Sequence, residues 1–539
     1  MGNEFPPQIK RHALMKNFTQ NFEALKTQFM QNAELEKKFS KEVFSETQKI
    51  SKESFAKDKN REDFRHLHIV CIDPDGAKDH DDAISVEETK SGYILGVHIA
   101  DVSHFVKPNS ALDKEARKRS YTQYLPWTAV PMLPDILSAN LCSLRENEER
   151  FSFSCIITLD KKCRVNKYRF TKGLIKVSRS ITYEQAMNLF EKRDKGICLL
   201  ARVAAGLKRT RCEGGILEMD STEYRCKFNK KGEPFSIVPR ESVQSNSWIE
   251  ECMLAANKCC ALELQKRKLN GIYRVHEAPD PQDIAELMQV EPNLFWGSPI
   301  DPGKLLKNYK AENSQDKRVF QLYSHIVKKA KGNPILTNRI LRSMQKAQYS
   351  PECNGHFALH WKDYAHFTSP IRRYADLWCH RELAGKKKEA VSGHWLAAGK
   401  ELCEDLNETE IKNQKAERKA LKLCASYLLQ DQIGQTFRAE IQGIEEFGIF
   451  ISVSSNTVAL ADGLVHLRDI PGDFYVYNEA RGILTGKRSG KSFKRGDKIT
   501  VKLIKVNPLK GENDFEIVAK IVPKSSDSPW ASKRRRSGR

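Results

Sequence analysis

The sequence contains no uninterrupted apolar run of roughly 18 residues, the length that a helix needs to cross a membrane. Its first residues, MGNEFPPQIKRHALMKNF, include no compact apolar stretch of the kind that directs secretion. Fourteen cysteines are scattered without any CxxC pair, which excludes a zinc knuckle and a small disulfide framework. No internal repeat is visible. These absences predict a globular protein with reduced thiols, located in the cytoplasm and not in a membrane.

Positive charge is in excess: 90 Lys and Arg against 69 Asp and Glu give a formal net charge of +21 over 539 residues. A surplus of this size favours a polyanionic partner, because Lys and Arg release the counterions that condense on phosphate groups. A solvated basic surface would have the same composition, so charge alone does not identify nucleic acid as the partner. The chain is long enough for about two to four domains.

Hydrophobic periodicity divides the chain into an N-terminal helical part, a mixed part and a β-rich part. Phe18, Phe22, Leu25 and Phe29 recur at helical spacing, which predicts helices within residues 1–60. From about residue 65 to residue 400 the pattern mixes strands and helices. Strands are expected at 68–72, 93–99 and 151–157, and helices at 247–264, 371–383 and 394–429.

From Gly434 the hydrophobic period changes to two, as in FRAEIQGI, FGIFISV, LVHL and KITVKLIKV. Short strands separated by turn residues predict a small β-barrel over residues 434–522. Residues 523–539 end in KRRRSGR and contain Ser and Pro, which is typical of a disordered basic tail.

Five aspartates gather within ten residues directly after the first expected strand: Asp73, Asp75, Asp79, Asp81 and Asp82. So many carboxylates repel one another unless a cation lies between them. Mg²⁺ takes carboxylate oxygens as ligands and keeps waters for a substrate phosphate. An EF-hand is excluded, because Ile84 stands where its twelfth residue, a glutamate, is required. A solvated acidic turn is the alternative to a metal site.

A second segment, HFTSPIRRYADLWCHR, combines hydroxyl groups, a proline and two arginines. Thr368-Ser-Pro predicts the start of a helix, with Arg372 and Arg373 in its first turn. Guanidinium groups beside the free N–H groups of a helix N-terminus bind phosphate. A charged helix cap on the surface is the alternative. Together, metal-binding carboxylates and a phosphate clamp indicate phosphodiester chemistry.

Six motifs in order carry a family resemblance: IDPDGAKDHDDAISV, VHIADVSHFV, YLPWTAVPMLP, WIEECMLAAN, YRVHEAP and YAHFTSPIRRYADLWCHR. Residues 61–430, which contain them, resemble the catalytic RNB domain of the ribonuclease II/R family. The block ADGLVHLRDIPGDFYVYNEARGILTGKRSGKSFKRGDKITVKL resembles the S1 domain of the family's bacterial ribonuclease R branch. The resemblance implies an α/β (α+β) RNB catalytic domain followed by an all-β S1 (OB-fold) barrel.

The same resemblance implies a 3′→5′ hydrolytic exoribonuclease that uses Mg²⁺ and releases nucleoside 5′-monophosphates. The expected partner is single-stranded RNA, or structured RNA with a 3′ overhang, bound by a monomer. A non-catalytic RNA-binding protein with the RNB fold is the alternative. A DNA nuclease would use the same metal chemistry, and the sequence does not display the 2′-OH contacts that distinguish the two sugars.

The resemblance also assigns roles to individual residues. The expected metal ligands are Asp73, Asp79, Asp81 and Asp82, and the expected catalytic residues are Asp81 and Arg372. RNA is expected to contact Tyr124, Arg372, Arg373, Glu417, Phe447, Phe450 and His466. A core aromatic is the alternative for Tyr124, and an exposed helix charge is the alternative for Glu417. His98, His104 and His276 also fall within the motifs, and packed or hydrogen-bonded roles are expected for them.

Two further expectations concern the barrel. Phe447 and Phe450 are three residues apart, so a regular strand would place them on opposite faces and leave one for the core. A basic cluster is expected to contact the RNA backbone and consists of Lys487, Arg488, Lys491, Lys494 and Arg495.

Full-length members of the family carry two small cold-shock barrels before the catalytic domain. Here the catalytic signature already begins at Arg61, and residues 8–60 resemble only the helical connector that follows those barrels. The chain is therefore expected to lack the cold-shock domains, either as a natural short form or as a fragment.

Overall fold

The computed structural model describes residues 21–50, 60–219, 222–309, 316–385, 393–479 and 482–520. Phe18 and the basic tail at 523–539 lie outside the described residues. All fourteen cysteines lie within them and are free thiols. No helix in this described part is long and apolar enough to cross a membrane.

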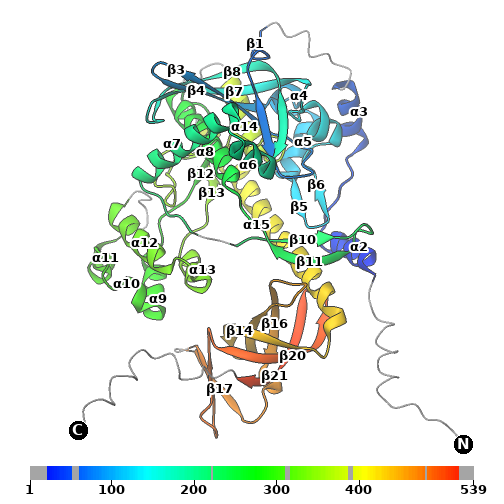
Figure 1. Ribbon diagram of the computed structural model, residues 1–539, viewed down its shortest axis with the longest axis vertical. Coiled ribbons are helices and arrows are strands. Elements are labelled where there is room, and N and C mark those ends of the chain that lie inside the picture. Colours follow the sequence, from blue (N-terminus) through cyan, green and yellow to red (C-terminus); the bar gives the residue numbers. More distant parts are fainter. Residues whose placement is uncertain are drawn as a thin grey trace, which may run out of the picture.

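A seven-stranded sheet forms the centre of the mixed part of the chain (Figure 1), with the strand order β1-β8-β7-β4-β3-β2-β9. Its strands are β1 (Glu62–Asp63), β2 (Val70–Asp73), β3 (Asp82–Thr89), β4 (Gly92–Ala100), β7 (Glu149–Asp160), β8 (Val165–Lys176) and β9 (Arg179–Thr182). Strands β2, β3, β4, β7 and β8 are antiparallel, whereas β1 and β9 join the sheet in parallel. Strand β4 is buried along nearly its whole length, which explains its almost continuous apolar sequence.

Helices cover this sheet and share its hydrophobic core. They are α3 (Lys41–Ile50), α4 (Val102–Phe105), α5 (Ala111–Arg119), α6 (Tyr183–Glu191), α7 (Lys195–Glu213), α8 (Gln244–Lys266) and α14 (Tyr374–Ala384), beside a π-helical turn at Leu137–Leu141. The long helix α8 contacts both β4 and β7, and its buried face carries Trp248, Cys252, Ala256 and Leu264. The strands and helices expected here are therefore present, with small shifts at their ends.

Five further helices form a separate lobe with its own core (Figure 1). They are α9 (Pro281–Val290), α10 (Pro292–Phe295), α11 (Pro302–Asn308), α12 (Lys317–Ala330) and α13 (Pro334–Arg342). Four of the five begin with proline directly after the N-cap residue, a position where its missing N–H has no cost. This lobe was not expected from the sequence as a unit distinct from the rest of residues 61–430.

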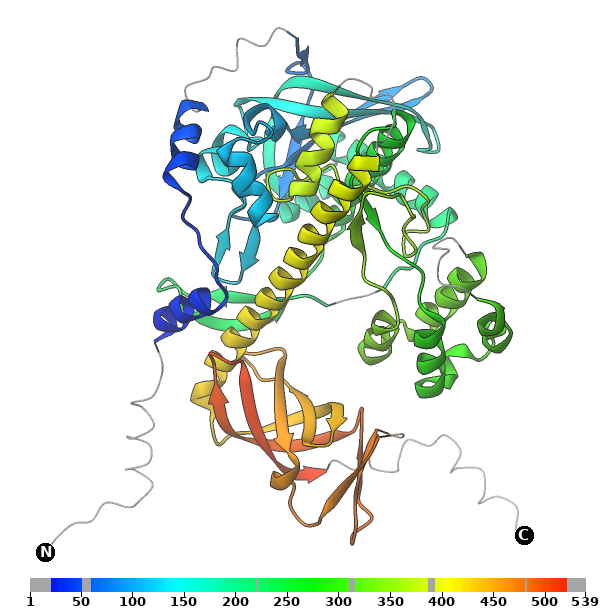
Figure 2. The same ribbon diagram turned by 180° about the vertical axis from the view of Figure 1, so that it is seen from behind.

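The helix α15 (Gly393–Leu429) connects the sheet region to the β-barrel (Figure 2). Its 37 residues span about 55 Å at 1.5 Å per residue. The last turns of α15 share a core with the barrel, with α2 (Phe22–Asn32) and with the hairpin of β10 (Tyr224–Phe228) and β11 (Pro234–Pro239). Phe22 and Phe29 of α2 pack in this core as the helical spacing predicted, 5.8 and 5.4 Å from the ring of Trp127.

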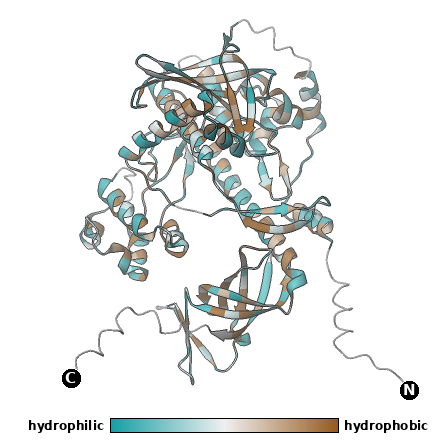
Figure 3. Ribbon diagram, in the orientation of Figure 1, coloured by the Kyte–Doolittle hydropathy of each residue, from teal (hydrophilic) through white to brown (hydrophobic). Residues whose placement is uncertain are grey.

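The β-rich part closes into a five-stranded barrel. Its strands are β14 (Thr436–Glu445), β15 (Gly448–Val453), β16 (Ala461–His466), β20 (Lys498–Asn507) and β21 (Glu512–Lys520), with 3₁₀ turns at Gln430–Gln432 and Leu467–Asp469. A small sheet of β17 (Tyr475–Asn478), β18 (Ile483–Gly486) and β19 (Ser492–Lys494) is inserted between β16 and β20. Figure 3 shows hydrophobic and hydrophilic residues alternating along the barrel strands, as their period of two predicted. The expected fold class, an α/β domain followed by an all-β barrel, is confirmed.

Candidate active site

The aspartate cluster lies on the hairpin between β2 and β3. Asp73 is the last residue of β2 and Asp82 is the first residue of β3, so antiparallel pairing brings both to one edge of the sheet. Asp79 and Asp81 lie in the connecting segment, which turns at Gly76 with a φ of +78°, a conformation that favours glycine. The local sequence thus gathers the four expected metal ligands at the end of two buried strands.

Asp81 is the most buried of these aspartates, with 3% of its surface exposed. Its Oδ1 accepts a hydrogen bond from the backbone N–H of Ile371 at 2.8 Å, and its Oδ2 lies 3.4 Å from Arg372 Nε. No hydrogen bond within the described part reaches Oδ2. Burial raises the pKa of Asp81 well above its usual value, and the Arg372 guanidinium opposes this effect. A buried carboxylate with one free oxygen is suited to a cation.

The neighbouring carboxylates disfavour one another's charge. Burial, followed by the negative charge of Asp73, raises the pKa of Asp82 to about 7. Asp79 and Asp82 add to the upward shift in the pKa of Asp81. In the described residues the four aspartates do not form a set of three ligand atoms within 4.8 Å of one another. The donor set and the free Oδ2 of Asp81 fit a divalent cation such as Mg²⁺, which would draw the carboxylates inward.

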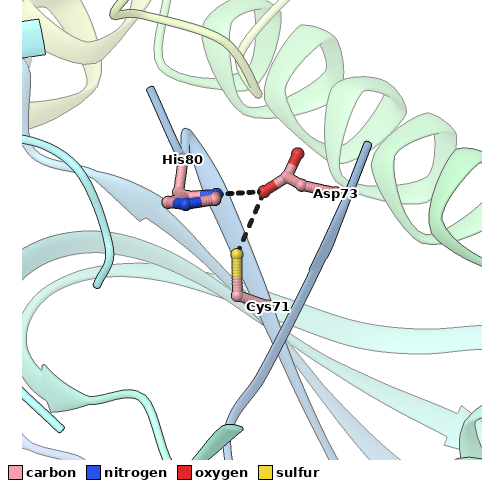
Figure 4. A group of neighbouring side chains, drawn as sticks. All are labelled: Cys71, Asp73 and His80. Carbon is pink, nitrogen blue, oxygen red and sulfur yellow. Dashed lines mark hydrogen bonds and ion pairs between the residues drawn. The ribbon is translucent and has the colours of Figure 1, made fainter. Parts of the chain in front are cut away.

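Asp73 is the centre of a small cluster that also contains Cys71 and His80 (Figure 4). Asp73 Oδ2 lies 3.1 Å from Cys71 Sγ and 2.6 Å from His80 Nδ1. The hydrogen bond to Asp73 raises the pKa of His80. Neither neighbour was expected from the sequence, although Cys71 stands two residues before Asp73 and His80 lies inside the aspartate cluster.

The expected helix start at Thr368 is wrong. Helix α14 begins only at Tyr374, and Arg372 and Arg373 precede it. The N–H of Arg373 donates to the carbonyl of Ser369 at 2.9 Å, and the N–H of Ser369 donates to Asp376 Oδ1 at 2.8 Å. These bonds close a tight turn over residues 369–373, and a β-bridge to Tyr121 holds Arg373 in an extended conformation. The two arginines are therefore not in a helical first turn.

The two arginines differ in what they contact. Arg373 forms an ion pair with Asp376 at 2.7 Å, and its side chain is 18% exposed. Although burial lowers the pKa of Arg373, the charge of Asp376 raises it above its usual value overall. The side chain of Arg372 is 43% exposed and touches Asp81 and the hydroxyl of Ser369. Arg372 is therefore the guanidinium that remains accessible beside the aspartates.

A cavity of about 200 Å³ adjoins this guanidinium. Four expected RNA contacts line it together: Tyr124, Arg372, Arg373 and Glu417. Tyr124 lies in β5 (Gln123–Leu125), which pairs with β6 (Thr128–Val130). The residue is 42% exposed, which excludes a role in the core. Its hydroxyl donates to Asp79 Oδ2 at 2.5 Å, so Tyr124 links the cavity to the aspartate cluster.

Other residues of the cavity wall were missed by the sequence analysis. On α15 they form a polar stripe with Glu417 at helical spacing: Glu410, Asn413 and Gln414. The cavity lining also includes Tyr121, His366 and Tyr349 of β13 (Gln348–Ser350), which pairs with β12 (Tyr273–Val275). Glu410 forms two hydrogen bonds with Arg274, at 2.7 and 2.8 Å, which fix its carboxylate. The spacing of the stripe was visible in the sequence, but not the face that it occupies.

On the barrel, Phe447 and Phe450 are both exposed, at 56% and 40%, so the expectation that one is buried is wrong. Phe447 lies in the turn between β14 and β15, where the alternation of a regular strand does not apply. The two rings meet edge to face, with centroids 5.7 Å apart. His466 pairs with Gly448 across the β15–β16 ladder, two residues from Phe450, and therefore lies on the same barrel face.

The basic cluster lies at the hairpin that joins β18 to β19 and just beyond it. Arg495 is half-buried, and the other four members are exposed: Lys487, Arg488, Lys491 and Lys494. Asp473 holds the base of this hairpin by accepting the N–H groups of Arg488 and Ser489, at 3.0 and 2.6 Å.

The three motif histidines are packed, as expected. His98 is fully buried and exchanges hydrogen bonds with Ser85 and Ser154, at 2.9 and 2.8 Å. His104 Nδ1 lies 3.1 Å from Arg61 Nη2, and His276 Nε2 lies 2.8 Å from the carbonyl of Gln345. Burial lowers the pKa of all three below its usual value.

Comparisons with family models give two matches. Residues 61–387 match the RNB domain, and residues 430–517 match the S1 RNA binding domain. The first match covers more than half of the chain and contains every residue of the aspartate cluster and the arginine turn.

Alignments with curated relatives cover most of this chain. Ribonuclease R 1 of Lactococcus lactis subsp. lactis is 33% identical over 494 residues, which are 89% of this chain and 59% of that protein. Ribonuclease R of Thermotoga maritima is 34% identical over 509 residues, which are 89% of this chain and 68% of that protein. The chain thus spans about three fifths to two thirds of the length of these relatives.

Solved structures agree with the sequence matches. The apo form of Mycoplasma genitalium RNase R superimposes with a TM-score of 0.81 at 27% identity, covering 92% of this chain and 78% of that chain. The same protein in complex with ribose methylated single-stranded RNA gives the same values.

Proposed function

This chain belongs to the RNB family of exoribonucleases as a homologue of ribonuclease R, and from that premise we propose that it hydrolyses RNA from the 3′ end with Mg²⁺. The products would be nucleoside 5′-monophosphates. One observation carries the proposal: a buried aspartate with a free oxygen, Asp81, contacts an accessible arginine, Arg372, at the edge of a cavity with an exposed tyrosine. These are the groups that hydrolysis of a phosphodiester requires in one place.

The proposed metal ligands are Asp73, Asp79, Asp81 and Asp82. Mg²⁺ held by these residues would supply an activated water and stabilisation of the charge on the leaving group. The chain itself supplies the geometry: Asp81 is fixed by the N–H of Ile371, and Asp79 by the hydroxyl of Tyr124. Asp79 is therefore held by a residue that also borders the cavity, and Asp81 by the residue next to Arg372.

Arg372 is proposed to stabilise the transition state. Negative charge grows on the phosphate oxygens during displacement, and a guanidinium aimed at them opposes this charge with little reorganisation. The Nε of Arg372 contacts Asp81 and one Nη contacts Ser369, which positions the group without covering it. Arg373 is proposed to border the substrate site while its charge is balanced by Asp376.

Tyr124 and Glu417 are proposed to contact the last nucleotides of the RNA. A base stacked on an aromatic ring gains about 1–3 kcal/mol without reading sequence. Tyr124 is oriented for this by its bond to Asp79, and Glu417 faces the same cavity from α15. The barrel would bind the RNA farther from its end through Phe447, Phe450 and His466, with the basic hairpin contacting phosphates.

The test is an assay of 5′-labelled single-stranded RNA and DNA of the same sequence, with Mg²⁺ or with EDTA. We expect RNA to shorten progressively from its 3′ end with Mg²⁺ only, and DNA to persist. Chromatography of the released products should give 5′-monophosphates. Binding of RNA without cleavage would favour the alternative, an RNA-binding protein with the RNB fold, and equal cleavage of DNA would favour a nuclease without sugar specificity.

A further inference from the structure

Cys71, Asp73 and His80 form a group of three different metal-binding side chains (Figure 4). Their ligand atoms, Sγ, a carboxylate oxygen and a ring nitrogen, all lie within 4.8 Å of one another. No other group of three or more such atoms is this close in the part of the chain that the structure describes. The expected Mg²⁺ ligands include only Asp73 of the three, so Cys71 and His80 are not explained by the proposed reaction.

The spacing of the three atoms suits a tetrahedral zinc ion. Zinc bonds of about 2.0–2.3 Å at tetrahedral angles place the ligand atoms roughly 3.3–3.6 Å apart. Here Asp73 Oδ2 lies 3.1 Å from Cys71 Sγ and 2.6 Å from His80 Nδ1. Movements of less than about 1 Å in these two distances would make room for the ion.

The backbone on both sides of the group is fixed. Cys71 lies within β2, where it pairs with Ser180 of the parallel strand β9. The N–H of His80 donates to Ser143 Oγ at 3.1 Å, and its carbonyl accepts the N–H of Leu144 at 3.0 Å. Only the side chains need to move, so the ligands are already gathered before a metal arrives.

We propose that Cys71, Asp73 and His80 bind Zn²⁺, or a divalent ion of similar softness, at a site that adjoins the proposed Mg²⁺ site and shares Asp73 with it. Thiolate and imidazole ligands select zinc over magnesium, which prefers oxygen. On binding, the thiol proton of Cys71 passes to solvent and Sγ bonds to the metal. Three protein ligands leave a fourth position for water.

The site has a consequence that rests on the proposed function. Figure 4 shows the second carboxylate oxygen of Asp73 pointing away from Cys71 and His80. While these two side chains donate to Oδ2, that second oxygen is free for Mg²⁺. Zinc on Oδ2 adds positive charge beside the Mg²⁺ ligands. It also lowers the negative charge that the Asp73 carboxylate offers to Mg²⁺. Zinc binding therefore inhibits cleavage, and this chain carries its own zinc-sensitive switch.

Binding can be tested without any assay of cleavage, with Co²⁺ as a spectroscopic probe for zinc. The full chain is stripped of metal with a chelator, exchanged into metal-free buffer and titrated with Co²⁺. We expect one equivalent to produce thiolate-to-cobalt charge-transfer absorption together with the intense visible bands of tetrahedral Co²⁺, and Zn²⁺ to abolish both. Co²⁺ held by carboxylates alone would give neither signal.

Matched variants locate the signal. Cys71→Ala should remove the charge-transfer band, and His80→Gln should weaken binding at least about 10-fold. Cys142→Ala is the control, because Cys142 is another fully buried thiol outside the group. If Cys71→Ala does not fold, His80→Gln still tests the site. Absence of the band in the native chain, its persistence in Cys71→Ala, or an unchanged Co²⁺ affinity in His80→Gln would overturn the proposal and leave Cys71 and His80 as hydrogen-bond donors to Asp73.

The effect on cleavage is measured separately, at saturating Mg²⁺. The zinc concentration that halves each variant's own zinc-free rate should rise at least about 10-fold in Cys71→Ala and stay constant in Cys142→Ala. Loss of the Co²⁺ signal without any change in zinc sensitivity would refute the switch. A native chain that binds Co²⁺ with the expected spectrum and never cleaves RNA would refute the proposed function and leave the zinc site in place.

Discussion

Asp81 Oδ2 lies 3.4 Å from Arg372 Nε. Asp81 Oδ1 accepts the N–H of Ile371, the residue before Arg372, which lies 290 positions after Asp81 in the chain. One carboxylate therefore fixes the arginine turn against the β2–β3 hairpin. The same residue is expected to bind the metal and to position the group that contacts the phosphate.

Replacement of Asp81 by Asn should abolish cleavage while RNA binding survives. Asn keeps the shape of the side chain and an oxygen for the N–H of Ile371, but it removes a charge from the metal site. We expect the turnover rate to fall at least about 10²-fold. Cleavage of labelled RNA and fluorescence anisotropy with the same RNA measure the two effects separately.

Asp75→Asn is the matched control, because Asp75 is an exposed carboxylate of the same loop outside the expected metal set. Its turnover should remain near that of the native chain. Near-native turnover by folded Asp81→Asn protein would contradict the assignment of Asp81.

Arg372→Lys should lower the rate of the chemical step more than it lowers RNA affinity. Lys keeps the positive charge but loses the planar fork that contacts two phosphate oxygens. An interaction that strengthens in the transition state affects turnover and not ground-state binding. Single-turnover kinetics at saturating enzyme measure the chemical step. Weaker binding with an unchanged chemical rate would assign Arg372 to recruitment of RNA.

The two roles of Tyr124 can be separated by two variants. Tyr124→Phe keeps the ring and removes the hydroxyl that donates to Asp79, whereas Tyr124→Ala removes both. If bases stack on the ring, Tyr124→Ala should lose about 1–3 kcal/mol of affinity for a short oligonucleotide, and Tyr124→Phe should retain it. Titration of a short single-stranded RNA in EDTA, which prevents cleavage, compares them. Equal losses of affinity in both variants would show that Tyr124 contributes to binding mainly through its hydrogen bond to Asp79.

The parts of the molecule that could be predicted from the sequence are those determined by local patterns. The strands expected at 93–99 and 151–157 correspond to the buried strands β4 and β7, and a period of two predicted the barrel. The aspartate cluster was predictable because its members lie on a single hairpin.

The errors have identifiable physical causes. Thr368-Ser-Pro has the residues of a helix N-terminus, but Asp376 accepts the N–H of Ser369 and closes a turn before the helix begins. Strand alternation failed for Phe447 because that residue lies in a turn. The stripe from Glu410 to Glu417 has clear helical spacing, yet only tertiary packing decides that it faces the cavity.

The barrel should bind RNA by stacking and by charge in separable ways. Its core is continuous with Leu423 and Leu429 of α15 and with Phe22 of α2, so its removal would expose apolar surface elsewhere. Point substitutions on its exposed surface are the better test.

The double variant Phe447→Ala, Phe450→Ala should weaken binding of long RNA without changing its dependence on salt. Replacement of Lys487, Arg488 and Lys491 by Gln should reduce the slope of log K against log salt by about 0.7 for each RNA phosphate that the barrel no longer neutralises. Anisotropy titrations at several salt concentrations measure both. Native affinity and slope in both variants would mean that the RNB domain is the main binding surface.

Buried histidines should make the RNB domain unstable in acid, with His98 as the clearest case. Burial lowers the pKa of His98 to about 3, whereas an unfolded histidine has a pKa of about 6.5. Between these values the unfolded chain binds a proton that the folded chain does not. Stability is therefore lost as pH falls through this window, by up to about 1.4 kcal/mol per pH unit for this residue alone.

His98→Gln should remove this contribution, because Gln can still form hydrogen bonds with Ser85 and Ser154 but does not titrate. Unfolding in urea at pH 7, 6 and 5 is monitored by hydrogen exchange at the backbone amides of β4. The exchange rates give the free energy of opening of the central sheet. The variant should be less stable than the native chain at pH 7, because Gln fills the site less well. Its free energy of unfolding should then fall less steeply toward pH 5. The difference between the two slopes should correspond to about one proton bound on unfolding. His104, His356 and His380, whose pKa values burial lowers to about 4, 3 and 4, should keep the remaining acid dependence. Parallel pH profiles for the two proteins would contradict a neutral His98 in the folded state.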